Sequence, residues 1–114
     1  MKIERYQFGR ITIDGQDYVN DIIIFPDRRI QDGWWRRQGH HMGVDDIAKL
    51  VVEAPEVIVA GTGAYGRMTV DETVENLLRE QQIELVAEPT AKAVELYSQM
   101  SAKQRVGACF HLTC

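Results

Sequence analysis

A chain of 114 residues is long enough for one hydrophobic core and too short for two, so we expect a single domain covering residues 1–114. Its composition, 45% hydrophobic and 26% charged, is typical of folded proteins and argues against disorder. A net charge of −4 argues against a general polyanion-binding role, so nucleic acid is not an expected partner.

No apolar run approaches the ~20 residues of a membrane-spanning helix, and the first residues lead directly into strand-like sequence rather than a signal peptide. We therefore expect no membrane insertion. Cys109 and Cys114 are the only cysteines, which is typical of a protein from a reducing compartment. The location that these features predict is cytoplasmic.

The N-terminal part of the chain has the pattern of β structure. Residues 3–13 alternate between polar and apolar side chains, but the apolar phase shifts at Gly9, which predicts one strand with a β-bulge or a bend there. Asp14-Gly15 is a strong signal for a type I′ turn and predicts a hairpin into a second strand over residues 16–25.

Apolar and helical patterns alternate along the rest of the chain. Thr69 with Glu72 has the pattern of a capping box, and Thr90 is a second N-cap candidate. Apolar strands separated by helices predict a parallel sheet, so the chain has the pattern of an α/β protein with an N-terminal antiparallel hairpin. The expected elements are a turn at residues 28–33, a short strand at 34–37, a polar loop at 38–43, helices at 44–53, 70–81 and 90–100, and strands at 57–60, 83–87 and 106–112.

A glycine-rich loop follows the strand at residues 57–60 and is the candidate ligand site. Its glycines satisfy the G-x-G-x-x-G spacing of dinucleotide-binding proteins. However, the capping signal at Thr69 comes after the third glycine, and a second mononucleotide-binding half is missing. Two alternatives stay open: a tight turn that needs glycine, and a small-ligand or anion site with Arg67 as the charge partner. The candidate ligand-binding residues are Gly61, Thr62, Gly63, Tyr65, Gly66 and Arg67.

A basic, aromatic stretch precedes the first helix. Trp and Arg are the residue types most enriched at binding hot spots, so we expect this stretch to contact a protein partner. Three alternatives stay open: a symmetric homodimer face, stacking on single-stranded nucleic acid, and aromatic packing with solvated arginines. The candidate partner-binding residues are Trp34, Trp35, Arg36, Arg37, His40 and His41.

The last strand carries a thiol and an imidazole on one face, Cys109 and His111. At this spacing they could act as nucleophile and base, or as metal ligands together with His40 and His41. No C-x-x-C pair is present, and a small cysteine in a buried strand is usually a packing residue. We therefore predict no catalytic residue, no metal site and no cofactor.

Several features taken together resemble one protein family. They are the Asp14-Gly15 hairpin, the loop at residues 59–63, Thr90-x-x-Ala93, Tyr97, and closing residues 105–114 with their H-x-T-C ending. The family is that of small single-domain proteins that includes the animal adipogenesis-associated domain protein and, more distantly, mitochondrial complex I assembly factor three. The resemblance implies a three-layer α/β fold, with a mixed, largely parallel central sheet flanked by helices and an extra antiparallel β layer.

The resemblance implies no catalytic residues, and the mitochondrial relative suggests an assembly or chaperone-like role. Our leading hypothesis is therefore a non-enzymatic binding or assembly-factor-like protein that acts through a protein partner. The alternative is a small-ligand, anion or nucleotide-binding protein, or an enzyme, that uses the glycine-rich loop.

Overall fold

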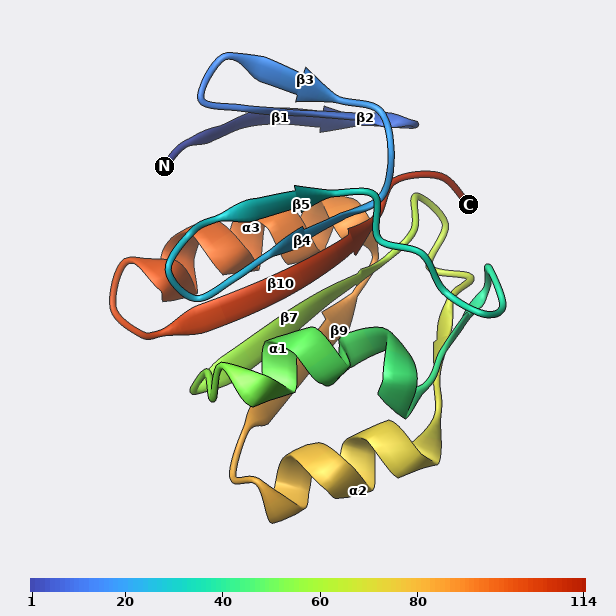
Figure 1. The fold of residues 1–114 in the computed structure, drawn as a ribbon. Coiled ribbons are helices and arrows are strands. Elements are labelled where there is room, and N and C mark those ends of the chain that lie inside the picture. The colour runs from blue at the N-terminus through green and yellow to red at the C-terminus, as the bar shows by residue number, and fades with distance from the viewer.

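The computed structural model describes residues 1–114 and has a central five-stranded sheet with helices on both faces and a smaller sheet above it (Figure 1). The strand order is β5-β4-β10-β7-β9. Strands β7, β9 and β10 run parallel, whereas β4 is antiparallel to β10 and β5 is antiparallel to β4. This mixed sheet confirms the predicted fold class. Its strands are β4 (Ile22–Ile24), β5 (Ile30–Asp32), β7 (Val57–Thr62), β9 (Glu84–Glu88) and β10 (Val106–His111).

Two crossover helices join the parallel strands, α2 (Glu72–Glu80) and α3 (Thr90–Ser101). Every residue of β7 and β10 is buried, as expected for strands covered on both faces. The chain leaves β7 through α2 to β9 on one side, then returns through α3 to β10 on the other. The carboxyl ends of β7 and β10 therefore lie next to each other.

The alternation of side chains along the strands divides the core into two clusters. Ile58 and Ala60 belong to the cluster beneath η1 (Val44–Ile47), α1 (Ala48–Val52) and α2. Val59 belongs to the cluster that also contains residues of α3 and the smaller sheet. Neighbouring residues of β7 thus pack against opposite layers, as the two-residue period of a strand requires.

The smaller sheet consists of the antiparallel strands β1 (Ile3–Gln7), β2 (Arg10–Ile13) and β3 (Gln16–Tyr18). Asp14 and Gly15 join β2 to β3 with φ values of 50° and 79°, which confirms the predicted hairpin. The prediction of one strand with a β-bulge or bend at Gly9 is wrong, because Gly9 lies in the turn between two strands. The phase shift in the sequence marks a reversal of the chain.

Two further predictions fail where the chain passes between the sheets. The strand expected over residues 16–25 is two strands, since β3 belongs to the smaller sheet and β4 to the central one. The segment at residues 34–37 is irregular, and the strand forms earlier, as β5, where a turn was expected. Trp34 turns inward here, and its Nε1 donates a hydrogen bond to Asp46 O at 2.9 Å. Tertiary packing therefore overrides the local pattern.

Both predicted helix caps are wrong. Thr69 lies in the short strand β8 (Thr69–Val70), which pairs with β6 (His41–Met42), and α2 is capped by Asp71 instead. Pro89 occupies the N-cap position of α3, so Thr90 falls in the first turn. The residues that α2 buries are Val74 and Leu78, and those that α3 buries are Thr90, Ala93 and Tyr97. None of the helices is long and apolar enough to cross a bilayer.

Candidate functional site

Three loops meet beyond the carboxyl ends of β7 and β10, at the right of Figure 1: the β1–β2 turn, residues 33–40, and residues 63–68. Gly9 N–H donates to Leu112 O at 2.9 Å, and Ala64 N–H donates to Thr113 O at 2.7 Å. The first and third loops are therefore both tied to the segment that follows β10.

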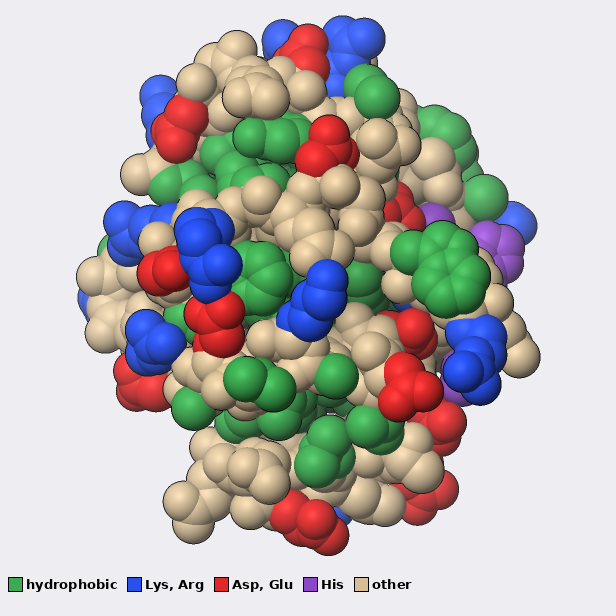
Figure 2. Space-filling view, viewed as in Figure 1, with side chains coloured by type: hydrophobic (Ala, Val, Ile, Leu, Met, Phe, Trp, Pro, Cys, Tyr) green, Lys and Arg blue, Asp and Glu red, His purple; other side chains and the backbone are tan.

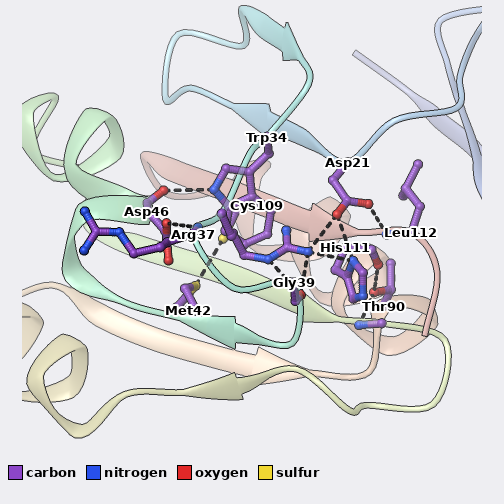
Figure 3. A network of polar contacts seen from close by, with 12 residues as sticks. Asp21, Trp34, Arg37, Gly39, Met42, Asp46, Thr90, Cys109, His111 and Leu112 are labelled. Atoms are coloured by element: carbon purple, nitrogen blue, oxygen red, sulfur yellow. Dashed lines mark hydrogen bonds and ion pairs between the residues drawn. The ribbon is translucent and has the colours of Figure 1, made fainter.

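A cluster of Asp21, Arg36 and His111 holds the second loop to β10 (Figure 3). Arg36 Nη2 lies 2.9 Å from Asp21 Oδ2, and His111 Nδ1 lies 2.8 Å from the same oxygen. The other carboxylate oxygen accepts the Leu112 N–H at 2.7 Å. The side chains of Arg36 and His111 are only 4% and 6% exposed and that of Asp21 is 18% exposed, so water reaches this polar cluster only at the carboxylate.

The hydrogen bonds assign the proton on the His111 ring. Arg36 Nη2 carries two hydrogens, of which one is directed to Asp21 and one to Gly39 O at 2.8 Å. It has none left for His111 Nδ1, which lies 3.0 Å away, so the Nδ1 proton is donated to Asp21. His111 Nε2 is then the free ring nitrogen. Both His111 Nε2 and Arg36 Nη1 are buried without a hydrogen-bond partner.

Thr90 joins this cluster to the glycine-rich loop. Its hydroxyl donates to His111 O at 2.6 Å and accepts the Gly63 N–H at 2.9 Å. Gly63 has a φ of +104°, and a Cβ there would lie 2.9 Å from His111 Cδ2 and 2.8 Å from Thr113 O. Only glycine therefore allows the turn to pack against the imidazole.

The candidate ligand-binding residues divide into a packed part and an exposed part. Gly61 and Thr62 lie inside β7, and a Cβ at Gly61 would lie 2.8 Å from Thr90 Oγ1, so Gly61 serves core packing. Tyr65 and Arg67 are exposed, with the Arg67 guanidinium 5.7 Å from the centroid of the Tyr65 ring. The loop leads into β8 rather than into a helix, so the strand, loop and helix of a dinucleotide-binding unit are not formed here.

The candidate partner-binding stretch divides in the same way. Trp34 and Arg36 are buried, with the Arg36 guanidinium 4.4 Å from the centroid of the Trp34 ring. Trp35 is 80% exposed, and Arg37 is also exposed, 3.9 Å from Asp45. The exposed His40 ring lies 6.0 Å from that of His111, measured between centroids.

The sixth residue of the stretch, His41, is half-buried in β6. Its Nδ1 lies 3.0 Å from Thr69 Oγ1, and its Nε2 lies 3.4 Å from Asp71 Oδ2. The pKa of Asp71 is lowered, mainly because its carboxylate accepts the Thr73 N–H and also because of His41. These contacts give His41 a structural role between β6, β8 and α2.

Exposed aromatic side chains gather around the buried cluster. Phe8 is 56% exposed and Tyr65 67% exposed, and their ring centroids are 6.2 Å apart. We call the surface formed by Phe8, Trp35, Tyr65, Arg37 and Arg67 the aromatic end surface. At the right of Figure 2, separate hydrophobic side chains lie among basic, histidine and acidic side chains.

Sequence reasoning missed Phe8 and Asp21. The only sequence signal for Asp21 is its position directly before the three buried isoleucines of β4.

Cys109 is a packing residue, although it lies on the same strand as His111. Its Sγ is 3.9 Å from Met42 Sδ, and burial raises the pKa of the thiol to about 12. A neutral, enclosed thiol is a poor nucleophile. No group of three or more His, Cys, Asp or Glu side chains is placed to hold a metal ion.

The match to a known family agrees with this architecture. The family of proteins of unknown function DUF498/DUF598 matches residues 3–111, so the chain belongs to that family. No curated protein matches the chain.

Solved structures share the whole fold. The conserved hypothetical protein PH1505 from Pyrococcus horikoshii OT3 is 31% identical, with a TM-score of 0.87 and 100% of both chains covered. An outer membrane protein from Bartonella henselae is 23% identical, with a TM-score of 0.81 over 98% of this chain and 94% of that one. A Mth938-like domain from Bordetella pertussis is 19% identical, with a TM-score of 0.69 over 97% of this chain and 85% of that one. The last two likenesses concern the fold alone.

Proposed function

We propose that this domain is a non-enzymatic binding protein that holds a protein partner on its aromatic end surface. One observation carries the proposal: every aromatic side chain among the large exposed hydrophobic residues lies at this end, namely Phe8, Trp35 and Tyr65. Exposed aromatic residues beside arginines are the composition of interface hot spots. Arg67 makes no ion pair within the chain, so it can pair with a carboxylate of the partner.

The anchoring of this surface also favours binding. Trp35 is flanked on both sides by buried residues, since Trp34 donates a hydrogen bond to Asp46 and Arg36 pairs with Asp21. Tyr65 lies in a turn closed by the hydrogen bond from Gly66 N–H to Gly63 O at 3.2 Å. Loops held in this way lose little conformational entropy on binding, which leaves more of the contact energy for affinity.

The resemblance to mitochondrial complex I assembly factor three supports an assembly-factor-like role for this domain when it binds its partner. The free thiols of Cys109 and Cys114 favour a cytoplasmic location. The absence of an assembled nucleophile and base around Cys109 favours binding over catalysis.

The test compares the proteins captured by the wild type with those captured by the double variant Trp35→Ser, Tyr65→Ser. Val52→Ser is the matched control, because Val52 is 82% exposed and lies on α1, away from this end. Substitutions at such exposed sites change stability by only about 0.5 kcal/mol. We expect the double variant to lose a protein that the wild type and the control retain. Identical partner sets for all three would refute the proposal.

Light scattering examines the alternative that the partner is a second copy of this chain. A wild-type dimer that becomes a monomer in the double variant would assign the aromatic end surface to self-association. A monomeric wild type excludes a homodimer and leaves a different protein as the partner.

A further inference from the structure

The strongest unexplained feature of the molecule is His111 Nε2. The imidazole is 6% exposed, and its Nδ1 is bonded to Asp21, but Nε2 has no partner at all. A buried polar atom without a hydrogen bond costs about 1–3 kcal/mol, so folded proteins rarely retain one without a reason. The surrounding chain thus fixes the ring firmly on one side and leaves the other nitrogen unsatisfied.

We propose that His111 Nε2 and the turn at residues 63–67 form a binding site for a small oxyanion, a carboxylate or phosphate, which is taken up together with one proton. The inference does not rest on the proposed partner binding.

The position of Nε2 supports a ligand site. Nε2 is bonded to Cδ2, the ring atom that Gly63 approaches, so it lies beside this turn. The turn follows β7, and β7 and β10 are the adjacent strands between which the chain changes direction along the sheet. In open α/β sheets, ligands bind in the crevice at this kind of switch point, beyond the carboxyl ends of the strands.

The charges around the ring favour an anion over a metal cation. Arg67 adds a guanidinium at the turn without a carboxylate of its own, whereas Arg36 lies on the Nδ1 side of the ring, where it is paired with Asp21. The backbone N–H groups of Tyr65 and Arg67 donate to no acceptor within the chain and can serve the remaining oxygens of a ligand. Asp21 is the one carboxylate in contact with the ring, and it lies on the Nδ1 side.

The hydrogen bond to Asp21 requires the proton. Because Nδ1–H is donated to Asp21, a neutral His111 presents only a lone pair at Nε2, which repels an oxyanion. An oxyanion therefore binds only if Nε2 gains a proton or if the ligand keeps its own and donates it. In both cases one proton enters with the anion, and Asp21 stabilises the positive charge on the ring.

His40 lies next to the His111 ring. Its ring packs edge-on against His111, but its side chain is exposed and makes no hydrogen bond. The His40 side chain can therefore rotate without breaking a polar contact. The titratable or charged groups that face the site are the His40 imidazole, the guanidinium groups of Arg36 and Arg67, the Asp21 carboxylate, the hydroxyls of Tyr6 and Tyr65, and Cys114, whose backbone oxygen lies next to Gly63.

The experiment titrates the full chain with inorganic phosphate and, separately, with acetate, and follows the nitrogen NMR signals of the His111 ring. We expect saturable movement of the Nε2 signal with one or both anions, and acetate binding that weakens as the pH rises, by at most about tenfold per pH unit for the uptake of one proton. A response to phosphate alone would assign the site to phosphate groups, and a response to acetate alone would assign it to carboxylates.

Two variants and one control variant test the assignment of residues. Arg67→Gln is exposed and should weaken binding severalfold, whereas Arg79→Gln, an exposed arginine on α2, should not. His111→Gln should abolish the pH dependence of whatever acetate binding remains, because acetate itself stays ionised near neutral pH. An Nε2 signal that does not respond to either anion, which is the behaviour of a nitrogen bonded to a water molecule, would overturn the proposal. Equal affinities for Arg67→Gln and the wild type would also overturn it.

Discussion

The glycine-rich turn allows a sharp test, because two glycines share an unusual backbone conformation but differ in their surroundings. Gly63 has a φ of +104° and Gly33 a φ of +100°. A Cβ at Gly33 would meet no atom within 4 Å, whereas one at Gly63 would lie 2.8 Å from two carbonyl oxygens and 2.9 Å from His111 Cδ2. Comparing Gly63→Ala with Gly33→Ala therefore separates the cost of close packing from the cost of the backbone conformation.

The expected magnitudes follow from these contacts. A positive φ in a residue with a Cβ costs about 1–3 kcal/mol, and both variants carry this cost. Overpacking adds about 1–3 kcal/mol at Gly63 alone, because the obstructing atoms are mainly backbone and cannot rotate away. Gly63→Ala should therefore lower the free energy of unfolding by about 1–3 kcal/mol more than Gly33→Ala. For a domain of this size that difference corresponds to a fall in Tm of about 4 °C or more.

Urea unfolding followed by circular dichroism measures the difference, with thermal melts as a second readout. Gly39→Ala is the control, since Gly39 has neither a positive φ nor an atom within 4 Å of the added carbon, and its stability should match that of the wild type. The stability of Gly66→Ala should fall between those of Gly63→Ala and Gly33→Ala, because the nearest atom to the added carbon is Pro89 Cγ at 3.3 Å. If Gly63→Ala and Gly33→Ala lose equal stability, close packing against His111 does not constrain the turn, and this reasoning is refuted.

Two other predictions concern buried groups. Thr90→Val keeps the shape of the side chain but leaves the Gly63 N–H and the His111 carbonyl without their partner, so we expect the free energy of unfolding to fall by about 2–4 kcal/mol. Thr90→Ser keeps the hydroxyl and should lower it by only about 1 kcal/mol. The reverse order in urea unfolding would contradict the role given to this hydroxyl. Cys109 should resist a thiol reagent in the folded protein while Cys114 reacts, and rapid labelling of both would contradict its burial. Burial raises the pKa of Cys109 from 9.0 to about 12, so the neutral thiol's contribution to stability is complete below pH 9 and is lost as the pH rises toward 12. We therefore expect the melting temperature to fall less steeply at alkaline pH in Cys109→Ala than in the wild type. Cys114→Ala should behave like the wild type.

The sequence by itself determines the elements of this structure that depend only on residues close together along the chain. Asp14-Gly15 specifies its hairpin because the positive φ values are a local property of those two residues. The continuous apolar runs of β7 and β10 and the apolar stripes of α2 and α3 are likewise visible in short windows. Together these elements predict a mixed α/β domain, and the glycines of the turn mark one edge of the candidate site.

Only the tertiary structure decides which residues are buried together. Arg36 looks like a surface residue beside Trp35, yet it is enclosed because Asp21 and His111, which lie 15 and 75 positions away, supply its partners. Thr69 has the pattern of a cap but pairs as a strand with His41. A charged side chain can be buried only where distant segments provide its hydrogen bonds, and no local pattern records which segments those are.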